Sequence, residues 1–346
     1  MDSATRFEKL LENRRSDPRF EEDIWRFLHQ ISGNLRNLTE RELNDRWRNI
    51  AKNILHLVDS GRDFEPLSSK GFSSWWWFQT LVHTEAELAS RGLPKPPVPD
   101  VASPAPLRPE FRPERVIAPR LWARIGEVRH LIRTLREGEI RFRPASSYAD
   151  VKLNEARYDA ELDKPRKRPG QALIMTRANG QRIKPIGDVS FSQRSTIEVN
   201  GTLKDVEYWI SSWSLELDPR LFSEFSKGNA IACDACLVVW DTEAFGDRVD
   251  AAVHARLRGW RFADIAVRYF DPYDLQSDDA LPASMEKDFV FGYQRELRLC
   301  LGSPMPVERG EPMFLTAGSL ADIAGLYDVN GGKLAGAGPE TYLANV

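Results

Sequence analysis

Three short segments carry side chains of complementary chemistry at the period-two spacing of β-strands. The first holds Arg141 and Arg143, which a strand would turn to one face. The second holds Ser212 and Ser214 in the same relation, with aromatic residues around them, and the third begins at Glu296. Guanidinium groups bind phosphate oxygens through paired hydrogen bonds, and a carboxylate can stabilise positive charge on a reacting sugar. These residue types therefore suit a phosphate-bearing substrate.

In chain order, the arginine strand, the S-x-S strand and the segment Gln294-x-Glu296 resemble the R-S-E class of ADP-ribosyltransferases. The resemblance covers residues 139–301. It implies an α+β fold that binds NAD as its substrate. It also implies that the glutamate stabilises the oxocarbenium formed when the nicotinamide–ribose bond breaks. The chain is also similar to uncharacterised bacterial domains that open on an Ile-Arg-Phe strand and close on Tyr-Gln-x-Glu-x-Arg.

The resemblance implies which residues would act. The catalytic residues would be Glu296 and, facing the acceptor, Gln294. The residues that would hold NAD lie on the first two strands, and they are Arg141, Arg143, Ser212, Ser214, Trp213 and Tyr208. Arg141 would bind the pyrophosphate, Ser212 would orient the ribose and the glutamate, and an aromatic ring would stack on the nicotinamide. The run of serines leaves the register open between Ser211 and Ser212.

The residues alone leave a structural alternative open. The two arginines of the first strand would then pair with Asp150 or Glu139 at the surface. Glu296 would bond Arg298 or Arg143 and have no catalytic role. Residues 150–192 have no counterpart in the resemblance.

Within that segment, Asn154, Arg157 and Glu161 have the spacing of one helical face and would lie near the site if the segment is helical.

Other chemistry has less support in the sequence. The chain has no glycine-rich phosphate loop of Rossmann or Walker type and no G-x-S-x-G elbow. Cys233 and Cys236 lack two further zinc ligands at a fitting spacing. The alternatives to a transferase are a non-catalytic protein that binds nucleic acid or a partner, and a metal-dependent nuclease. The nuclease would use acidic residues from the set Asp264, Asp271 and Glu286.

Residues 1–93 are predicted to form a helical accessory module. Thr39 and Glu42 have the spacing of a capping box, and apolar residues follow at intervals of three and four. Trp75, Trp76 and Trp77 cannot share one helical face, because successive residues are about 100° apart. We expect at least one of them to pack against the rest of the chain, in preference to an open groove.

Residues 94–119 are rich in proline and are predicted to be a linker or an extended strap. Residues 120–346 would form an α+β domain with a mixed or antiparallel sheet, because only short helices separate several strands. A helix is predicted over residues 121–136. The predicted strands cover residues 139–143, 172–176, 206–214, 235–240, 265–270, 289–293, 296–301 and 313–316.

The formal net charge of −3 hides two basic segments, residues 108–143 and 164–168. Such segments attract anions, so they are candidates for contact with a macromolecular acceptor, either protein or nucleic acid. No apolar run is long enough to span a membrane, and the N-terminus lacks the apolar stretch of a secretory signal. Three cysteines do not make a disulfide framework. We therefore expect a cytoplasmic protein without a membrane partner, by analogy a bacterial toxin or defence effector.

Overall fold

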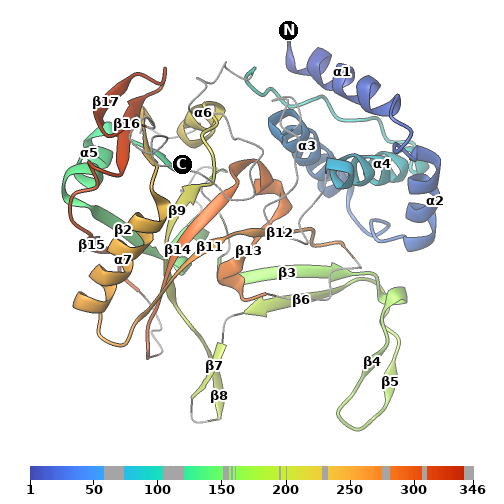
Figure 1. The fold of residues 1–346 in the computed structure, drawn as a ribbon. Helices are drawn as coiled ribbons and strands as arrows, with labels where there is room; N and C mark the ends of the chain where they lie inside the picture. The colour runs from blue at the N-terminus through green and yellow to red at the C-terminus, as the bar shows by residue number, and fades with distance from the viewer. Residues whose placement is uncertain are drawn as a thin grey trace.

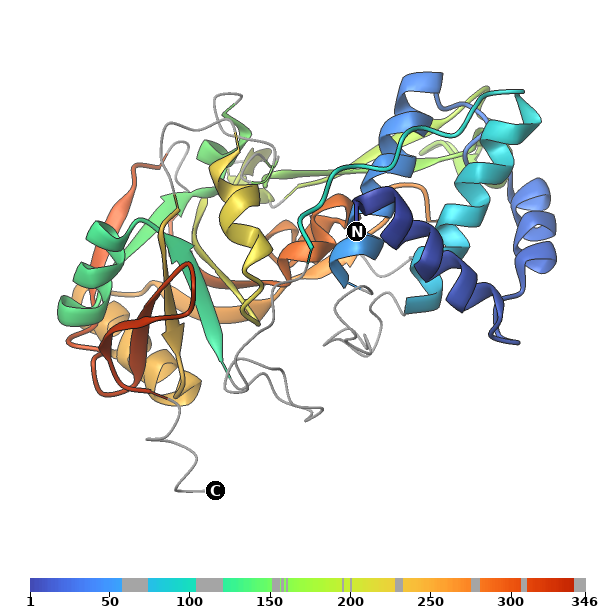
Figure 2. The ribbon, with the colours of Figure 1, turned by 90° about the horizontal axis from the view of Figure 1, so that it is seen from above.

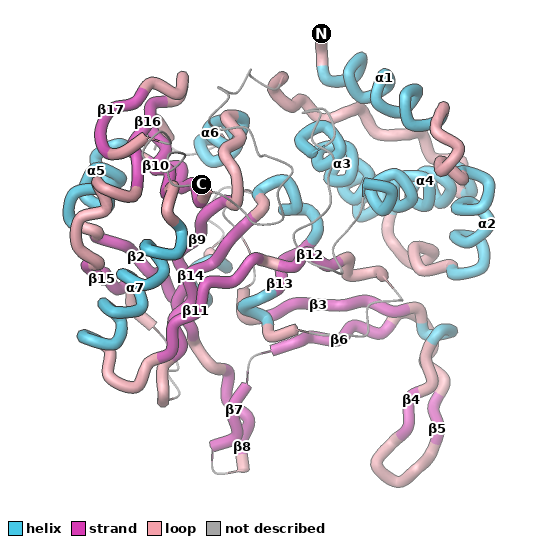
Figure 3. Tube along the Cα trace, viewed as in Figure 1, coloured by secondary structure: helices cyan, strands magenta, loops and turns pink. Residues whose placement is uncertain are grey.

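The structure is a computed structural model that describes residues 1–57, 74–103, 121–150, 156, 159, 161–194, 196–199, 201–227, 233–274, 281–305 and 310–338. Helices gather at the N-terminal end, and a large sheet with helices against it forms most of the remainder (Figures 1 and 3).

In its described residues the N-terminal module has four helices: α1 (Ser3–Arg15), α2 (Glu22–Ser32), α3 (Glu40–Leu57) and α4 (Ser74–Ser90). The predicted capping box begins α3. The backbone N–H of Thr39 donates to Glu42 Oε2 at 2.8 Å, and the N–H of Glu42 donates to Thr39 Oγ1 at 3.2 Å. Each side chain thus satisfies a backbone donor that the first turn would leave unpaired.

Residues 94–103 of the proline-rich segment form an extended strap along the helices (Figure 2). The side chain of Val101 is buried in the core of the helical module, and its carbonyl accepts a hydrogen bond from Ser3 Oγ at 3.0 Å. Over these residues the segment predicted as a linker or a strap is extended and packs on the helices, while residues 104–119 lie outside the described part of the chain.

The large sheet has nine strands, and every pair in it is antiparallel. The strand order is β11 (Arg261–Ala266), β14 (Glu296–Gly302), β9 (Tyr208–Ser214), β1 (Trp122–Gly126), β10 (Ala235–Val239), β16 (Ala324–Asp328) and β17 (Lys333–Gly336), with β2 (Glu139–Pro144) and β15 (Met313–Thr316) as a branch from β9. The predicted α+β class with an antiparallel sheet is confirmed.

The sheet forks at β9. One edge of β9 pairs with β14 along the whole strand. On the other edge, β1 meets β9 only at Ser214, and β2 meets it only at Ile210 and Trp209. Among the described strands none pairs with residues 211–213 on that edge, so β1 and β2 diverge around them. We call this place the fork.

Helices α5 (Val128–Glu137) and α7 (Thr242–Arg256) cover one face of the sheet through a single hydrophobic cluster. Alternate residues of β9 and β14, such as Trp213 and Leu299, enter this cluster, whereas Ser212 and Arg298 are turned to the opposite face. The hydrophobic core thus holds one face of the fork rigid and leaves the other for polar side chains.

Four two-stranded sheets and several short helices complete the described chain. The strand pairs are β3 (Asp163–Arg168) with β6 (Val189–Arg194), β4 (Met175–Thr176) with β5 (Arg182–Ile183), β7 (Thr196–Val199) with β8 (Thr202–Asp205), and β12 (Arg268–Phe270) with β13 (Glu286–Asp288). The helices are α6 (Arg220–Ser226) and the 3₁₀ turns η2 (Ala145–Ala149), η3 (Gly170–Ala172), η4 (Ala283–Met285) and η5 (Phe289–Gln294). The β4–β5 and β7–β8 hairpins project from the body (Figure 1).

Three predicted elements are wrong. The first half of the helix over residues 121–136 is strand β1, because its residues pair with β9 and β10 and bury side chains on both faces. The strand over residues 289–293 is η5, whose first turn is held by Asp288, a carboxylate that accepts from the N–H of Val290 at 3.0 Å. Of residues 172–176, only Met175–Thr176 is a strand.

The helical module packs directly on η5. Trp76 and Trp77 of α4 contact the ring of Phe289, with centroids 5.8 and 6.0 Å apart, which confirms that tryptophans of this run face the rest of the chain. Phe289 and Tyr293 belong to the same buried cluster as the helices. Asn53 of α3 accepts from the N–H of Tyr293 at 2.7 Å. The module and the larger part therefore share one hydrophobic core.

A buried ion pair fixes the same junction. Arg46 of α3 donates from both terminal nitrogens to the two carboxylate oxygens of Asp271, at 2.8 and 2.6 Å. Both side chains are about 5% exposed, so each charge depends on the other for its solvation. In the described residues, no helix is long and apolar enough to cross a membrane.

We predict that Arg46→Ala lowers the free energy of unfolding by about 3–5 kcal/mol, because it leaves the Asp271 carboxylate buried without its guanidinium. Arg48→Ala on the same helix is the matched control. Arg48 pairs with Asp45 at 3.2 Å with both side chains exposed, so its loss should cost about 1 kcal/mol or less. Urea unfolding of both variants tests this, and equal losses would contradict the assignment of the junction to this pair.

Candidate functional site

Glu296 is the first residue of β14, and its backbone is held on both sides. Arg295 before it has a φ of 45°, a left-handed conformation that turns the chain from η5 into the strand. The N–H of Glu296 donates to the hydroxyl of Tyr269 at 2.8 Å, and its carbonyl accepts from the N–H of Val267 at 2.9 Å. The side chain of Glu296 therefore extends from a fixed backbone position at the edge of the fork.

The Glu296 carboxylate is buried, and three side chains donate to it. Oε1 accepts from Ser212 Oγ at 2.7 Å and from Arg298 Nε at 2.9 Å. Oε2 accepts from Lys287 Nζ at 2.6 Å. Burial alone would raise the pKa of Glu296, but the charges of Arg298 and Lys287, with their hydrogen bonds, hold it well below the ordinary value. The group is thus a carboxylate at neutral pH.

A wider ion-pair network surrounds this carboxylate. Arg298, fully buried, also donates to Glu161 Oε1 at 2.6 Å. Lys164 Nζ lies 2.8 Å from Asp159 and 3.2 Å from Glu161. These contacts join β14 to the turn before β3.

Glu286 of β13 binds a second group of cations, with Arg166 Nη2 at 2.6 Å and Arg268 on its other oxygen. Because each described charge in the network has an opposite partner, burial is tolerated.

The arginines of β2 lie on the other side of the fork. Arg141 is exposed, with its guanidinium 5.9 Å from the centroid of Phe314. Arg143 is half-buried and lies 4.9 Å from the ring of Tyr148, which follows in η2. Arg143 Nη2 donates to the carbonyl of Ser147 at 3.3 Å. No carboxylate in the described part of the chain pairs with either arginine.

Arg124 is a third arginine at the fork, which the sequence analysis missed because it placed this residue in a helix. Arg124 extends from β1, where its Nη1 donates to Ser211 Oγ at 2.6 Å. Its guanidinium lies over the indole of Trp213 at 5.4 Å. Residues 121–125 are apolar apart from Arg124, a short run that is consistent with a buried strand but that spacing alone does not distinguish from a buried helix.

The structure brings the three predicted segments together, since β2 and β14 are both neighbours of β9. The three serines of β9 have different partners. Ser212 bonds Glu296, whereas Ser211 accepts from Arg124, and Ser214 Oγ donates to the carbonyl of Gln294 at 2.9 Å.

The structural alternative holds in part. Arg298 does pair with Glu296, as that alternative expected, but Glu139 pairs with Arg133 rather than with the arginines of β2.

Three predicted positions need correction. Trp213 cannot stack on a ligand at the Ser212 face, because its indole is buried in the core on the opposite face, 5.1 Å from Phe245. Tyr208 is buried too, and its hydroxyl donates to the carbonyl of Glu161 at 2.9 Å.

Gln294 does not face outward. Its amide nitrogen donates to the carbonyl of Ala156 at 2.7 Å, and its oxygen accepts from Lys287 at 3.0 Å. Both polar ends of this side chain are therefore engaged, so it does not present an amide to an acceptor.

The basic segment 164–168 is committed to internal contacts. Lys164 and Arg166 are buried in ion pairs, Lys167 pairs with Glu42 at 3.1 Å, and Arg168 donates to backbone carbonyls. It therefore offers little free charge to a polyanion. Of the other basic segment, residues 108–120 lie outside the described part, as do Asn154 and Arg157.

In the part of the chain that the structure describes, no group of three or more His, Cys, Asp or Glu side chains is placed to hold a metal ion. Burial raises the pKa of the Cys236 thiol, which disfavours the thiolate that zinc needs.

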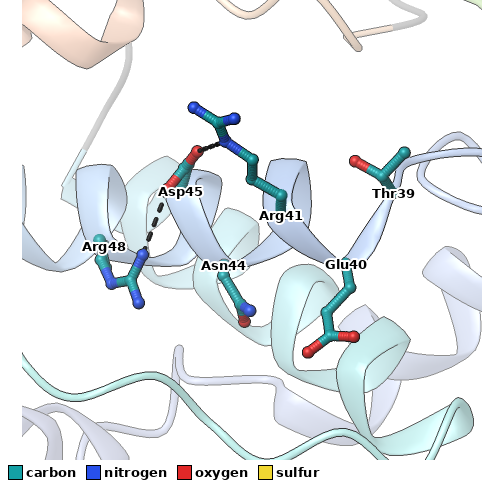
Figure 4. Close-up of a pocket in the computed structure, with 6 residues that line it drawn as sticks. All are labelled: Thr39, Glu40, Arg41, Asn44, Asp45 and Arg48. Atoms are coloured by element: carbon teal, nitrogen blue, oxygen red, sulfur yellow. Dashed lines mark hydrogen bonds and ion pairs between the residues drawn. The ribbon is translucent and has the colours of Figure 1, made fainter.

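A surface recess lies on α3, lined by Thr39, Glu40, Arg41, Asn44, Asp45 and Arg48 (Figure 4). Because one helix and the residue before it supply every lining residue, the recess has no opposing wall to enclose a ligand. It shares no residue with the fork, so we do not consider it a functional site.

Comparisons of the chain with protein-family models, with curated proteins and with solved structures find no match.

Lys287→Met should lower the free energy of unfolding by about 3–5 kcal/mol at pH 7, because Glu296 loses one of its two cationic partners in a buried site. The loss should shrink in acid. The pKa of Glu296 is lowered from 4.5, so its contribution to stability is complete above about pH 4.5 and disappears as pH falls through the folded pKa. In Lys287→Met the folded pKa of Glu296 is higher, so the ionised carboxylate contributes less to the free energy of unfolding and less of it is lost in acid. Urea unfolding at pH 7 and pH 3 measures the difference, because the loss begins to shrink only below the raised folded pKa of the variant.

Lys167→Met is the control, because the side chains of Lys167 and its partner Glu42 are 37% and 41% exposed. It should cost about 1 kcal/mol or less at both pH values. A Lys287→Met loss that stays the same at both pH values would show that Lys287 does not stabilise the ionised carboxylate.

Proposed function

We propose that the chain is an NAD-dependent ADP-ribosyltransferase whose fork binds NAD. One observation carries the proposal: Ser212 Oγ donates to Glu296 Oε1 at 2.7 Å, on neighbouring strands, beside an arginine strand whose guanidinium groups have no carboxylate partner among the described residues. The order and chemistry of the three strands are those that the resemblance implies.

The chemistry assigned to the fork follows from its charges. The arginines of β2 would bind the pyrophosphate, which brings the nicotinamide ribose toward Glu296. The bond between ribose C1′ and the nicotinamide nitrogen breaks, and its electron pair leaves with nicotinamide. The cationic sugar is stabilised by the carboxylate, an acceptor nucleophile then bonds to C1′, and its proton passes to solvent.

Lys287 sets a condition on this reaction. Both oxygens of Glu296 are already engaged, and the ammonium of Lys287 holds Oε2 at 2.6 Å. A cationic sugar gains little from a carboxylate whose charge is already neutralised. The proposal therefore requires Lys287 to withdraw from Oε2 as NAD binds, while Ser212 and Arg298 keep Oε1 in place.

Further parts of the proposal concern the acceptor and the setting. The helical module and the projecting hairpins offer surface beyond what NAD needs, so we propose a macromolecular acceptor and a cytoplasmic toxin or defence role by analogy. The rival binding-protein function is weakened, because the basic residues 164–168 are paired within the chain.

We expect purified protein to release nicotinamide from NAD, and Glu296→Gln to lower that turnover at least 100-fold, because the charge that meets the oxocarbenium is lost. Ser212→Ala should lower kcat less, by about 10-fold, since it removes only one hydrogen bond to the carboxylate. Chromatographic measurement of nicotinamide release gives the rates.

Glu286→Gln is the matched control, because it removes an equally buried carboxylate of the same network that does not touch Ser212. It should be destabilised like Glu296→Gln and still turn over NAD. Absence of turnover in the wild type, or equal turnover in folded Glu296→Gln, would overturn the catalytic assignment.

A further inference from the structure

We propose that the chain forms a homodimer in which the outer face of α2 packs antiparallel against the same face of a second copy. Figures 1 and 2 show α2 at the end of the helical module that is farthest from the large sheet. Because α2 shares no residue with the fork, this dimer does not rest on the proposed function.

The inner face of α2 is packed into the helical module. Trp25 is buried, and its ring meets that of Phe20 edge-on, with the centroids 5.0 Å apart. His29 is also buried, and its Nε2 atom lies 2.8 Å from Glu87 Oε2 of α4. These contacts fix the rotation of α2 about its own axis, and so they decide which side chains face outward.

The outer face of α2 is apolar as well. Its side chains are spaced three and four residues apart and form one stripe along the helix, with exposed fractions from 44% to 66%. The residues of the stripe are Ile24, Phe27, Leu28 and Ile31. No other helix in the described part of the chain exposes more than one large apolar side chain. Because a helix that is apolar on both faces is typical of an element covered on both sides, a second surface is expected to cover the stripe.

The two ends of the stripe carry opposite charges. Asp23, in the first turn of α2, is exposed and pairs with no cation among the described residues. At the other end, Arg36 Nη2 donates to the carbonyl of Gln30 at 2.6 Å. Arg36 is exposed, and no carboxylate of the described chain pairs with it. Each charge therefore has room for an opposite charge from outside the chain.

These charges favour a second copy in the antiparallel direction. Asp23 and Gln30 are seven residues apart, so they lie on the same flank of the stripe, and the guanidinium of Arg36 is close to Gln30. When two such helices pack about a two-fold axis, equal flanks face each other with their ends exchanged, so Asp23 of each copy meets Arg36 of the other. A parallel pair would instead place Asp23 beside Asp23, which repel each other.

The acidic start of α2 also argues against a membrane surface as the partner. Anionic headgroups attract Lys and Arg, whereas Glu21 and Asp23 would be repelled by them. The stripe would bury a few hundred Å² of apolar surface on each copy, less than the ~800 Å² per partner of a standard stable interface. We therefore expect a reversible dimer with a Kd in the micromolar range.

Sedimentation velocity of the full chain, from about 1 µM to about 300 µM, tests the dimer. We expect the average mass to rise with concentration from that of one chain toward that of two. Ile31→Asp should raise the Kd by about 10-fold or more, because it would place a carboxylate in an apolar contact. The variant should keep its fold, since Ile31 is exposed in a single copy.

Ile186→Asp is the matched control, because Ile186 is an exposed isoleucine that follows β5 and lies outside α2. It should dimerise like the wild type. A wild type that stays monomeric at every concentration would overturn the proposal and leave the stripe to a partner of another kind. An unchanged Kd in folded Ile31→Asp would overturn it as well.

Charge reversal tests the direction of the pair. Asp23→Arg and Arg36→Asp should each raise the Kd about 3- to 10-fold, because each creates two like-charge contacts per dimer. The double variant exchanges the two charges, so it should dimerise nearly as the wild type does. If the double variant associates no better than either single variant, the antiparallel arrangement is wrong.

Discussion

Arg298 is the group around which the described polar interior is arranged. Its side chain is fully buried, and it donates to Glu296 on its own strand, to Glu161 in the turn before β3, and to the carbonyls of Ser284 and Glu286 near β13. The positions of three separate segments thus depend on one planar cation. Without it, two carboxylates would be buried with less compensation than burial requires.

The same arrangement ties the site to the helical module. Gln294 is the last residue of η5, Lys287 precedes η5 and Glu296 follows it, and α3 and α4 contact η5 through Asn53 and Trp77. The helices therefore help to define the segment that carries the carboxylate and its ammonium partner. The hydrophobic cluster covers one face of the sheet, and the helices contact η5. The fork, where β1 and β2 separate beside β9, lies between these two packed regions of the chain.

Much of the site could be predicted because its strands obey a local rule. Alternation of side chains identified β2, β9 and the start of β14, and their adjacency agrees with the order that the resemblance suggested. The predictions that were wrong concern residues whose structure depends on partners far away in the sequence. Arg124 was misplaced because apolar residues at 121, 125, 128 and 135 mimic a helical face, while pairing with β9 and β10 makes the segment a strand. Lys287 meets Glu296 only through folding, so no spacing in the sequence reveals it. Glu161, which the sequence placed near the site on a helical face, contacts Arg298 from a turn instead.

The Arg46–Asp271 pair joins residues 225 positions apart, and this separation has a consequence for the timing of synthesis. The helices emerge from the ribosome first, yet their partner surface on η5 and Asp271 is made only after more than two hundred further residues. Until then the guanidinium of Arg46 has no carboxylate to meet, and the carboxylate at position 296 does not yet exist. A chain released early would therefore lack both the completed junction and the group proposed to act on the sugar. An incomplete product would therefore lack the activity that we propose.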